Sequence, residues 1–179
     1  MANHSQLDSQ VAHAWNTKKF TDGSKIELGR VNFEQAFIVT PSSILEVEVT
    51  SRGMYKCSNG RSGLFTKFDY DNIRPNAGGH THPKGRDGKV LPYPGPNDGA
   101  FARMTRASGK PTYVLSSHAA YKVEYDSGEY RVSIVAGKKG YSREIRDVVK
   151  RWLSADKKGS APVNTSRCDF KVMTKDELR

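Results

Sequence analysis

The chain has 179 residues, of which 36% are hydrophobic, and its basic residues outnumber its acidic residues by 29 to 19. This length and apolar content support one domain with one modest core and exclude two separate cores. The formal charge of +10 can attract nucleic acid, cell-wall polymers, acidic lipid or an acidic inhibitor protein. The basic residues are spread thinly in short pairs, without the interleaved aromatics of a nucleic-acid surface, so nucleic acid is a disfavoured partner.

The first predicted element is a short N-terminal helix. Ser5 and Asp8 resemble a capping box, and apolar residues follow at helical spacing from Leu7 to Trp15. The helix should end before the turn at residues 21–23. Short apolar or alternating runs after this turn predict strands, over residues 32–40, 45–50, 54–57 and 64–70.

Residues 72–98 differ in character because glycine and proline are concentrated there. A segment this long without regular structure is unusual in a compact domain and is usually functional or disordered, so we expect a long ordered loop. A helix is then predicted over residues 98–107, with Gly109 as its stop. The remaining patterns predict strands over 112–117, 119–125, 129–136 and 168–173, and an amphipathic helix over 141–155.

The order helix, strands, helix, strands, helix predicts a mixed α+β or three-layer fold. We expect a single domain over residues 1–179, with its core within about residues 7–136. The helix over 141–155 and a tail over 156–179 extend this core.

The sequence shows no targeting or membrane signal. Its start, MANHSQLDSQ, lacks the charged and then apolar pattern of a secretory signal, and no apolar run reaches the ~18 residues of a membrane span. We expect a protein that is cytoplasmic as synthesised, and export by a signal-peptide-independent system stays open. Cys57 and Cys168 lie far apart without a CxxC motif, so spacing does not decide whether they pair.

The motif His80-Thr81-His82-Pro83 is the sharpest local signal for chemistry. In an extended segment the side chains alternate, so His80 and His82 project to the same side. Two imidazoles on one side can both offer nitrogen to one ion, and imidazole suits Zn²⁺. The alternative is a pair of surface histidines in a polar loop.

Asp98 is the candidate third ligand. It stands directly before a predicted helix, where the chain can return its carboxylate to the histidines. Asp also fills the N-cap position of helices routinely, and one carboxylate could hardly serve both roles. The residues alone leave these two readings of Asp98 open.

Taken together, four motifs in this chain order resemble the JAB/MPN (JAMM) metallopeptidase domain. The likeness is closest to the JAB-like domains that end bacterial polymorphic toxins, and it spans about residues 7–136. The motifs are Glu34 in NFEQAFIV, His80 and His82 in GGHTHP, Asp98 in PGPNDGAFARM, and the strand Gly109-Lys-Pro-Thr-Tyr-Val-Leu-Ser.

The resemblance implies a cytidine-deaminase-like, JAB-type β-sheet flanked by helices. It also implies a zinc ion held by His80, His82 and Asp98, with water in the fourth position. Glu34 is then the general base that takes the proton of this water. Glu46 and Glu48 are the competing carboxylates, but they alternate with apolar residues and so should face solvent.

The chain departs from the family pattern in ways that bear on activity. The family carries a serine three residues before the aspartate, where its hydroxyl helps to stabilise the oxyanion, and here that residue is Gly95. Tyr93 or Asn97 can donate a hydrogen bond in its place. The loop from His82 to Asp98 is longer than in the family, and RPNAGG before His80 is a poor strand.

The leading functional hypothesis is a zinc-dependent peptidase or amidase that hydrolyses a peptide or isopeptide bond, or a cell-wall substrate. Deployment as an antibacterial toxin effector fits the resemblance, and an acidic immunity protein would then suit the basic surface. One alternative is a catalytically inactive JAB-like module for interaction or phage structure, which Gly95 favours. A second is a nucleic-acid-acting protein, suggested by the charge and the HxH motif.

Overall fold

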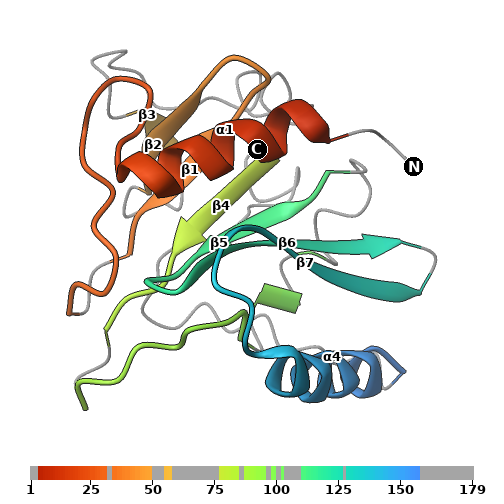
Figure 1. Ribbon diagram of the computed structural model, residues 1–179. Coiled ribbons are helices and arrows are strands. Elements are labelled where there is room, and N and C mark those ends of the chain that lie inside the picture. Colours follow the sequence, from red (N-terminus) through yellow and green to blue (C-terminus); the bar gives the residue numbers. More distant parts are fainter. Residues whose placement is uncertain are drawn as a thin grey trace.

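Two helices and a single β-sheet make up the described part of the chain, and this arrangement confirms the α+β class (Figure 1). Helix α1 (Ser5–Thr17) and helix α4 (Ser142–Lys157) pack against the sheet. The computed structural model describes residues 4–31, 34–49, 55–57, 77–84, 87–95, 98–99, 102, 110–126 and 128–157.

The described strands form a seven-stranded sheet in the order β3-β2-β1-β4-β5-β6-β7. The pairing of β4 with β5 is parallel, and the other neighbouring strands are antiparallel. Strand β3 pairs antiparallel with β2, and β6 pairs antiparallel with β7 on either side of Gly128. The strands are β1 (Ala36–Val39), β2 (Ile44–Val49), β3 (Tyr55–Cys57), β4 (Ala77–Thr81), β5 (Thr112–Leu115), β6 (Ala119–Asp126) and β7 (Glu129–Gly137).

Strand β4 lies in the middle of the sheet, in a segment expected to lack regular structure, so that expectation was wrong. Its glycines are the reason. A Cβ on Gly79 would lie 2.3 Å from the Tyr113 carbonyl oxygen and 2.5 Å from Cζ of Phe37. The bare backbone lets the Phe37 ring lie directly on the strand, and this packing outweighs the low strand propensity of glycine.

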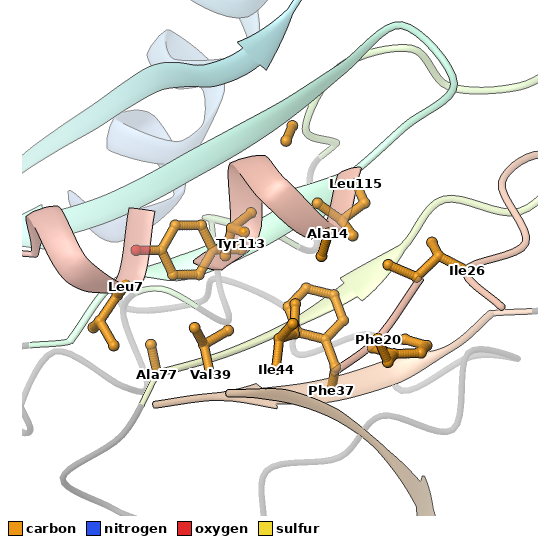
Figure 2. Close-up of a cluster of buried hydrophobic side chains, with 12 residues drawn as sticks. Leu7, Ala14, Phe20, Ile26, Phe37, Val39, Ile44, Ala77, Tyr113 and Leu115 are labelled. Atoms are coloured by element: carbon orange, nitrogen blue, oxygen red, sulfur yellow. The ribbon is translucent and has the colours of Figure 1, made fainter. Parts of the chain in front are cut away.

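The two faces of the sheet carry separate apolar clusters, as alternation along β5 shows. Tyr113 and Leu115 pack with Leu7 and Ala14 of α1, and Figure 2 shows these side chains meeting beneath the helix. Val114, between them in sequence, belongs instead to the cluster under α4. The sheet therefore separates a layer formed by α1 from a layer formed by α4, as the three-layer expectation required.

The N-terminal capping box was predicted wrongly. His4 occupies the N-cap position and makes no side-chain capping bond, while Ser5 is already helical. The Asp8 carboxylate instead accepts hydrogen bonds from the Tyr113 hydroxyl at 2.6 Å and from Lys122 Nζ at 2.8 Å. Asp8 thus ties α1 to β5 and β6 rather than to its own first turn.

Several expectations fall outside the described residues: the strands over 64–70 and 168–173, residues 103–107 of the predicted helix, and Cys168. For Cys57 the structure describes only the backbone, in β3. No helix in the described part of the chain is long and apolar enough to cross a membrane.

Candidate metal centre

His80 and His82 lie on the face of the sheet that α4 covers. His80 is the register partner of Val114 on β5, and the Val114 side chain packs under α4. His82 follows two residues later and so lies on the same side. The two imidazole centroids are 5.4 Å apart, which confirms that the HxH motif presents both rings together.

Asp98 closes the group, as its place before a helical turn suggested. One carboxylate oxygen lies 2.7 Å from Nε2 of His80, and the other lies 3.1 Å from Nε2 of His82. All three residues are buried, with relative exposures of 8%, 6% and 4% in chain order. Their potential ligand atoms lie within 4.8 Å of one another. The sequence-predicted ligand set is therefore assembled in space.

The backbone of the preceding loop orients the Asp98 carboxylate. Gly95 N–H donates to Oδ2 of Asp98 at 2.6 Å, and the Asp98 N–H donates back to the Gly95 carbonyl at 3.1 Å. The carboxylate thus faces this loop and the histidines. These contacts favour the ligand role over the N-cap role that the sequence left open.

Helix α4 supports the turn that carries Asp98. A Cβ built on Gly99 would lie 2.3 Å from Cδ2 of Trp152, and Trp152 is buried. Only a glycine lets the indole approach the backbone so closely. The contact of Gly99 with Trp152 was not predicted, because nothing local to either residue reveals a contact between such distant segments.

Glu34 lies at the edge of the same group. The Gln35 N–H bonds the Thr81 hydroxyl, and the Thr81 N–H bonds the Gln35 carbonyl, both at 2.9 Å, so the pairing of β1 with β4 continues towards Glu34. Ala36 is the register partner of His80, and alternation places Glu34 on that same face. Its Oε1 lies 3.8 Å from Nε2 of His80.

Glu46 lies on the opposite face of the sheet. Its register partner is Phe37, whose ring belongs to the cluster under α1. The sheet therefore separates Glu46 from the histidines. Glu48 follows in the same strand, and its side chain is outside the described residues.

The group has the electrostatics of a cation site. Burial alone disfavours a charged imidazole, but the carboxylates of Asp98 and Glu34 outweigh it and raise the pKa of His80 to about 9. Burial would likewise favour neutral Asp98, yet His80 and His82 hold the pKa of Asp98 well below its usual range. Without metal, a proton on His80 thus supplies the positive charge that the carboxylates stabilise.

The loop over residues 91–95 orients the His82 ring by contacting its Nδ1, the ring nitrogen that does not face Asp98. Nδ1 of His82 lies 2.8 Å from the Leu91 carbonyl oxygen, and since a carbonyl only accepts, Nδ1 carries the proton. When the ring is neutral, Nε2 is therefore the nitrogen that can bind a metal, in place of its 3.1 Å contact with Oδ2 of Asp98. The Pro92 carbonyl accepts from the Ser116 hydroxyl at 2.9 Å and the Tyr121 hydroxyl at 2.8 Å. These two hydroxyls fix the loop to the sheet.

Of the two predicted oxyanion donors, Tyr93 and Asn97, the structure describes only Tyr93. The Tyr93 ring packs against Tyr141 at the start of α4, with centroids 5.5 Å apart, and joins the apolar cluster under that helix. Asn97 lies outside the described residues. At Gly95 a Cβ would lie 2.6 Å from Cδ2 of Leu91, so Leu91 fills the space that the family serine would need.

The donor set fits a zinc ion. Two imidazole nitrogens and one carboxylate oxygen are common zinc ligands, and two ligands of one tetrahedral zinc lie about 3.3 Å apart. The observed contacts of 2.7 and 3.1 Å from Asp98 to the imidazoles are hydrogen-bond lengths. Each of these two contacts is therefore only a few tenths of an ångström shorter than the spacing of two tetrahedral zinc ligands.

No protein-family model, no curated protein and no solved structure matches the chain. The resemblance to the JAB/MPN domain is thus carried by the motifs and their order alone.

Proposed function

We propose that the chain is a zinc-dependent hydrolase of the JAMM type, with a JAB-type sheet, that cleaves a peptide or isopeptide bond. The observation that supports this most is the burial of His80, His82 and Asp98 on one face of the sheet with the Glu34 carboxylate beside them. Three protein ligands leave one coordination position of a tetrahedral ion open. An open position is typical of catalytic zinc, whereas structural zinc has four protein ligands.

When bound, zinc supplies Lewis acidity, which polarises the substrate carbonyl and lowers the pKa of water. His80, His82 and Asp98 hold it, and the Leu91 carbonyl keeps His82 in the tautomer that ligation requires. Glu34 takes the proton of the attacking water and passes it to the leaving amine. The short separation between Glu34 and His80 supports this role, because it keeps the base beside the ligand group.

Metal content tests the ligand set. The purified protein, reconstituted with Zn²⁺ and freed of excess metal, should hold one zinc per chain. The double variant His80→Ala/His82→Ala should hold none while keeping the circular dichroism of the folded protein. A wild-type protein without zinc after reconstitution would refute the metal centre.

Glu34→Gln tests the general base. We expect hydrolysis of a fluorogenic peptide or isopeptide substrate to fall by about 10²–10⁴-fold, because proton transfer by a positioned side chain contributes this much. Zinc content should stay at the wild-type level. Glu46→Gln, on the far face of the sheet, is the matched control and should keep full activity. Full activity of Glu34→Gln would rule out this mechanism.

A second candidate function is an inactive JAB-like interaction module, and the contact of Leu91 with Gly95 favours it. The space for a serine hydroxyl beside Asp98 is taken by the Leu91 side chain. This alternative predicts zinc binding without hydrolysis in the wild type. The double variant Gly95→Ser/Leu91→Ala restores both the hydroxyl and its space, and appearance of hydrolysis only in this variant would identify the wild type as the inactive form.

The biological setting stays a prediction. Action as an antibacterial effector, a cell-wall substrate and an acidic immunity protein all follow from the resemblance and the charge of +10. Hydrolysis assays on branched isopeptides, linear peptides and cell-wall peptides would separate the substrate classes.

A further inference from the structure

The loop over residues 91–95 contacts two of the three candidate zinc ligands. At the start of the loop, the Leu91 carbonyl oxygen lies 2.8 Å from Nδ1 of His82. At its end, the Gly95 N–H donates a hydrogen bond to Oδ2 of Asp98 at 2.6 Å. The orientations of His82 and Asp98 therefore both depend on the path of this one short span of backbone.

Within this loop, Pro92 is the point of attachment to the sheet. Its carbonyl oxygen accepts hydrogen bonds from the Ser116 hydroxyl at 2.9 Å and from the Tyr121 hydroxyl at 2.8 Å. The proline ring restricts φ at Pro92, so only one soft torsion separates this carbonyl from the Leu91 carbonyl that contacts His82. Holding the first carbonyl therefore also restricts the second.

Both hydroxyls come from the face of the sheet that carries the ligands. Tyr121 is the register partner of Val114, which is in turn the register partner of His80. Ser116 follows Val114 by two residues, and both Ser116 and Tyr121 are 0% exposed, so packing directs their hydroxyls. Burial, and to a lesser extent Tyr141, raises the pKa of Tyr121 to about 12. The Tyr121 hydroxyl therefore stays a donor at neutral and moderately alkaline pH.

We propose that Ser116 and Tyr121 are positioning residues of the metal centre. By holding the Pro92 carbonyl, the two hydroxyls keep the loop on the path that orients His82 and Asp98, and so they set the zinc affinity. The inference rests on the proposed metal centre. It applies to a hydrolase and to an inactive zinc-binding module alike, because it concerns zinc affinity and not turnover.

Tyr121→Phe is the cleanest test, since it removes the hydroxyl and keeps the ring. Zinc affinity, measured by chelator competition, should fall about tenfold, at the lower end of the ~10–100-fold that loss of an outer-sphere partner costs. Tyr113→Phe is the matched control, because its hydroxyl bonds Asp8 at 2.6 Å on the α1 face of the sheet. At a temperature where both variants are folded, Tyr113→Phe should bind zinc as the wild type does.

Replacement of zinc by Co²⁺ adds a readout of ligand geometry. The visible absorption of bound Co²⁺ depends on how its ligands are arranged around the ion. Tyr121→Phe saturated with Co²⁺ should therefore give a spectrum that differs from that of the wild type, and Tyr113→Phe should give the wild-type spectrum. A hydroxyl that served only the fold would lower the free energy of unfolding and leave the spectrum unchanged.

A double-mutant cycle tests whether the two hydroxyls act through the same carbonyl. Ser116→Ala should also weaken zinc binding, and the effect of Ser116→Ala/Tyr121→Phe should differ from the product of the single effects, because groups that share one acceptor are coupled. Zinc bound by the wild type and equally tightly by Tyr121→Phe, an equal loss in Tyr113→Phe, or independent single effects would each overturn the positioning role and leave the metal centre intact. A wild type that binds no zinc would refute both.

Discussion

The two faces of the sheet are built from different kinds of contact. Under α1, apolar side chains such as Val11, Phe37 and Ile44 form one continuous cluster (Figure 2). Under α4, the apolar cluster shares its face with the buried polar residues of the candidate site, His80, His82 and Asp98. The α1 face therefore forms a hydrophobic core, and the α4 face combines a hydrophobic core with the candidate metal site.

This difference sets what a substitution on each face should change. On the α1 face we expect effects on the free energy of unfolding, with zinc affinity unchanged in the folded protein. On the α4 face we expect effects on zinc affinity, because the same contacts that pack the helix also position the ligands.

Asp98→Asn should abolish tight zinc binding. The change removes the carboxylate that both imidazoles contact. The loss of affinity should exceed the ~10–100-fold that loss of an outer-sphere partner costs. Titration of the metal-free protein with zinc and a competing chelator measures it. Asp87→Asn, an exposed carboxylate between His82 and Asp98, is the control, and an equal loss there would show that the effect is not specific to the ligand.

Zinc affinity should rise with pH between about 6.5 and 9. His80 must lose its proton to bind the ion, and its pKa in the folded, metal-free protein is about 9. Each pH unit in this window should therefore raise the affinity about tenfold. The same raised pKa stabilises the metal-free fold fully below about pH 6.5, the unfolded value, and this stability is lost as pH rises through about 9.

Chelator competition at several pH values measures the slope of affinity, and chemical denaturation of the metal-free protein over the same range measures the stability. A slope near zero would contradict the protonation of His80. His80→Gln is the matched variant and should remove both dependences.

Ile44→Ala should lower the free energy of unfolding by about 2–5 kcal/mol, because it leaves a cavity in a fully packed cluster. Ile44 is 2% exposed and lies under α1, away from the histidines. Zinc affinity at a temperature where the variant is folded should equal that of the wild type. Ile44→Val, a smaller deletion at the same position, should cost less, and a fall in zinc affinity for either variant would break the separation of the faces.

Gly99→Ala should lower both the free energy of unfolding and the zinc affinity, each by a smaller amount. The new methyl group meets the Trp152 ring, and such overpacking costs about 1–3 kcal/mol. The displaced turn should also weaken zinc binding about tenfold, as loss of support to a ligand does elsewhere. Gly140→Ala, where a Cβ has nothing within 4 Å, should change neither quantity. Unchanged zinc affinity in Gly99→Ala would show that α4 does not position Asp98.

The sequence predicted most of the fold wherever periodicity was local. The amphipathic pattern of α4 and the alternation in β6 and β7 are properties of neighbouring residues, and the observed elements agree with them. Strand β4 was missed because Gly78 and Gly79 have low intrinsic strand propensity. In the fold, Gly79 leaves room for the ring of Phe37, a residue distant in the chain, and local patterns do not reveal this contact.

In the candidate site, too, local spacing could be predicted from the sequence, whereas contacts between distant residues could not. His80 and His82 could be paired by their spacing, Asp98 was left open between ligand and N-cap, and Glu34 was placed with them only through the resemblance. The structure brings all four together. The hydroxyls of Ser116 and Tyr121 on the Pro92 carbonyl were not predicted, because such contacts depend on the path of a loop that local patterns do not describe.

The contact between Gly99 and Trp152 has a consequence for biosynthesis. A ribosome makes the chain from its N-terminus, so His80, His82 and Asp98 leave the exit tunnel before Trp152 does. Because α4 supports the turn that carries Asp98, the nascent chain holds all three ligands before it can fix their geometry. On the proposed function, tight capture of a metal ion would therefore be among the last steps in maturation of the described fold.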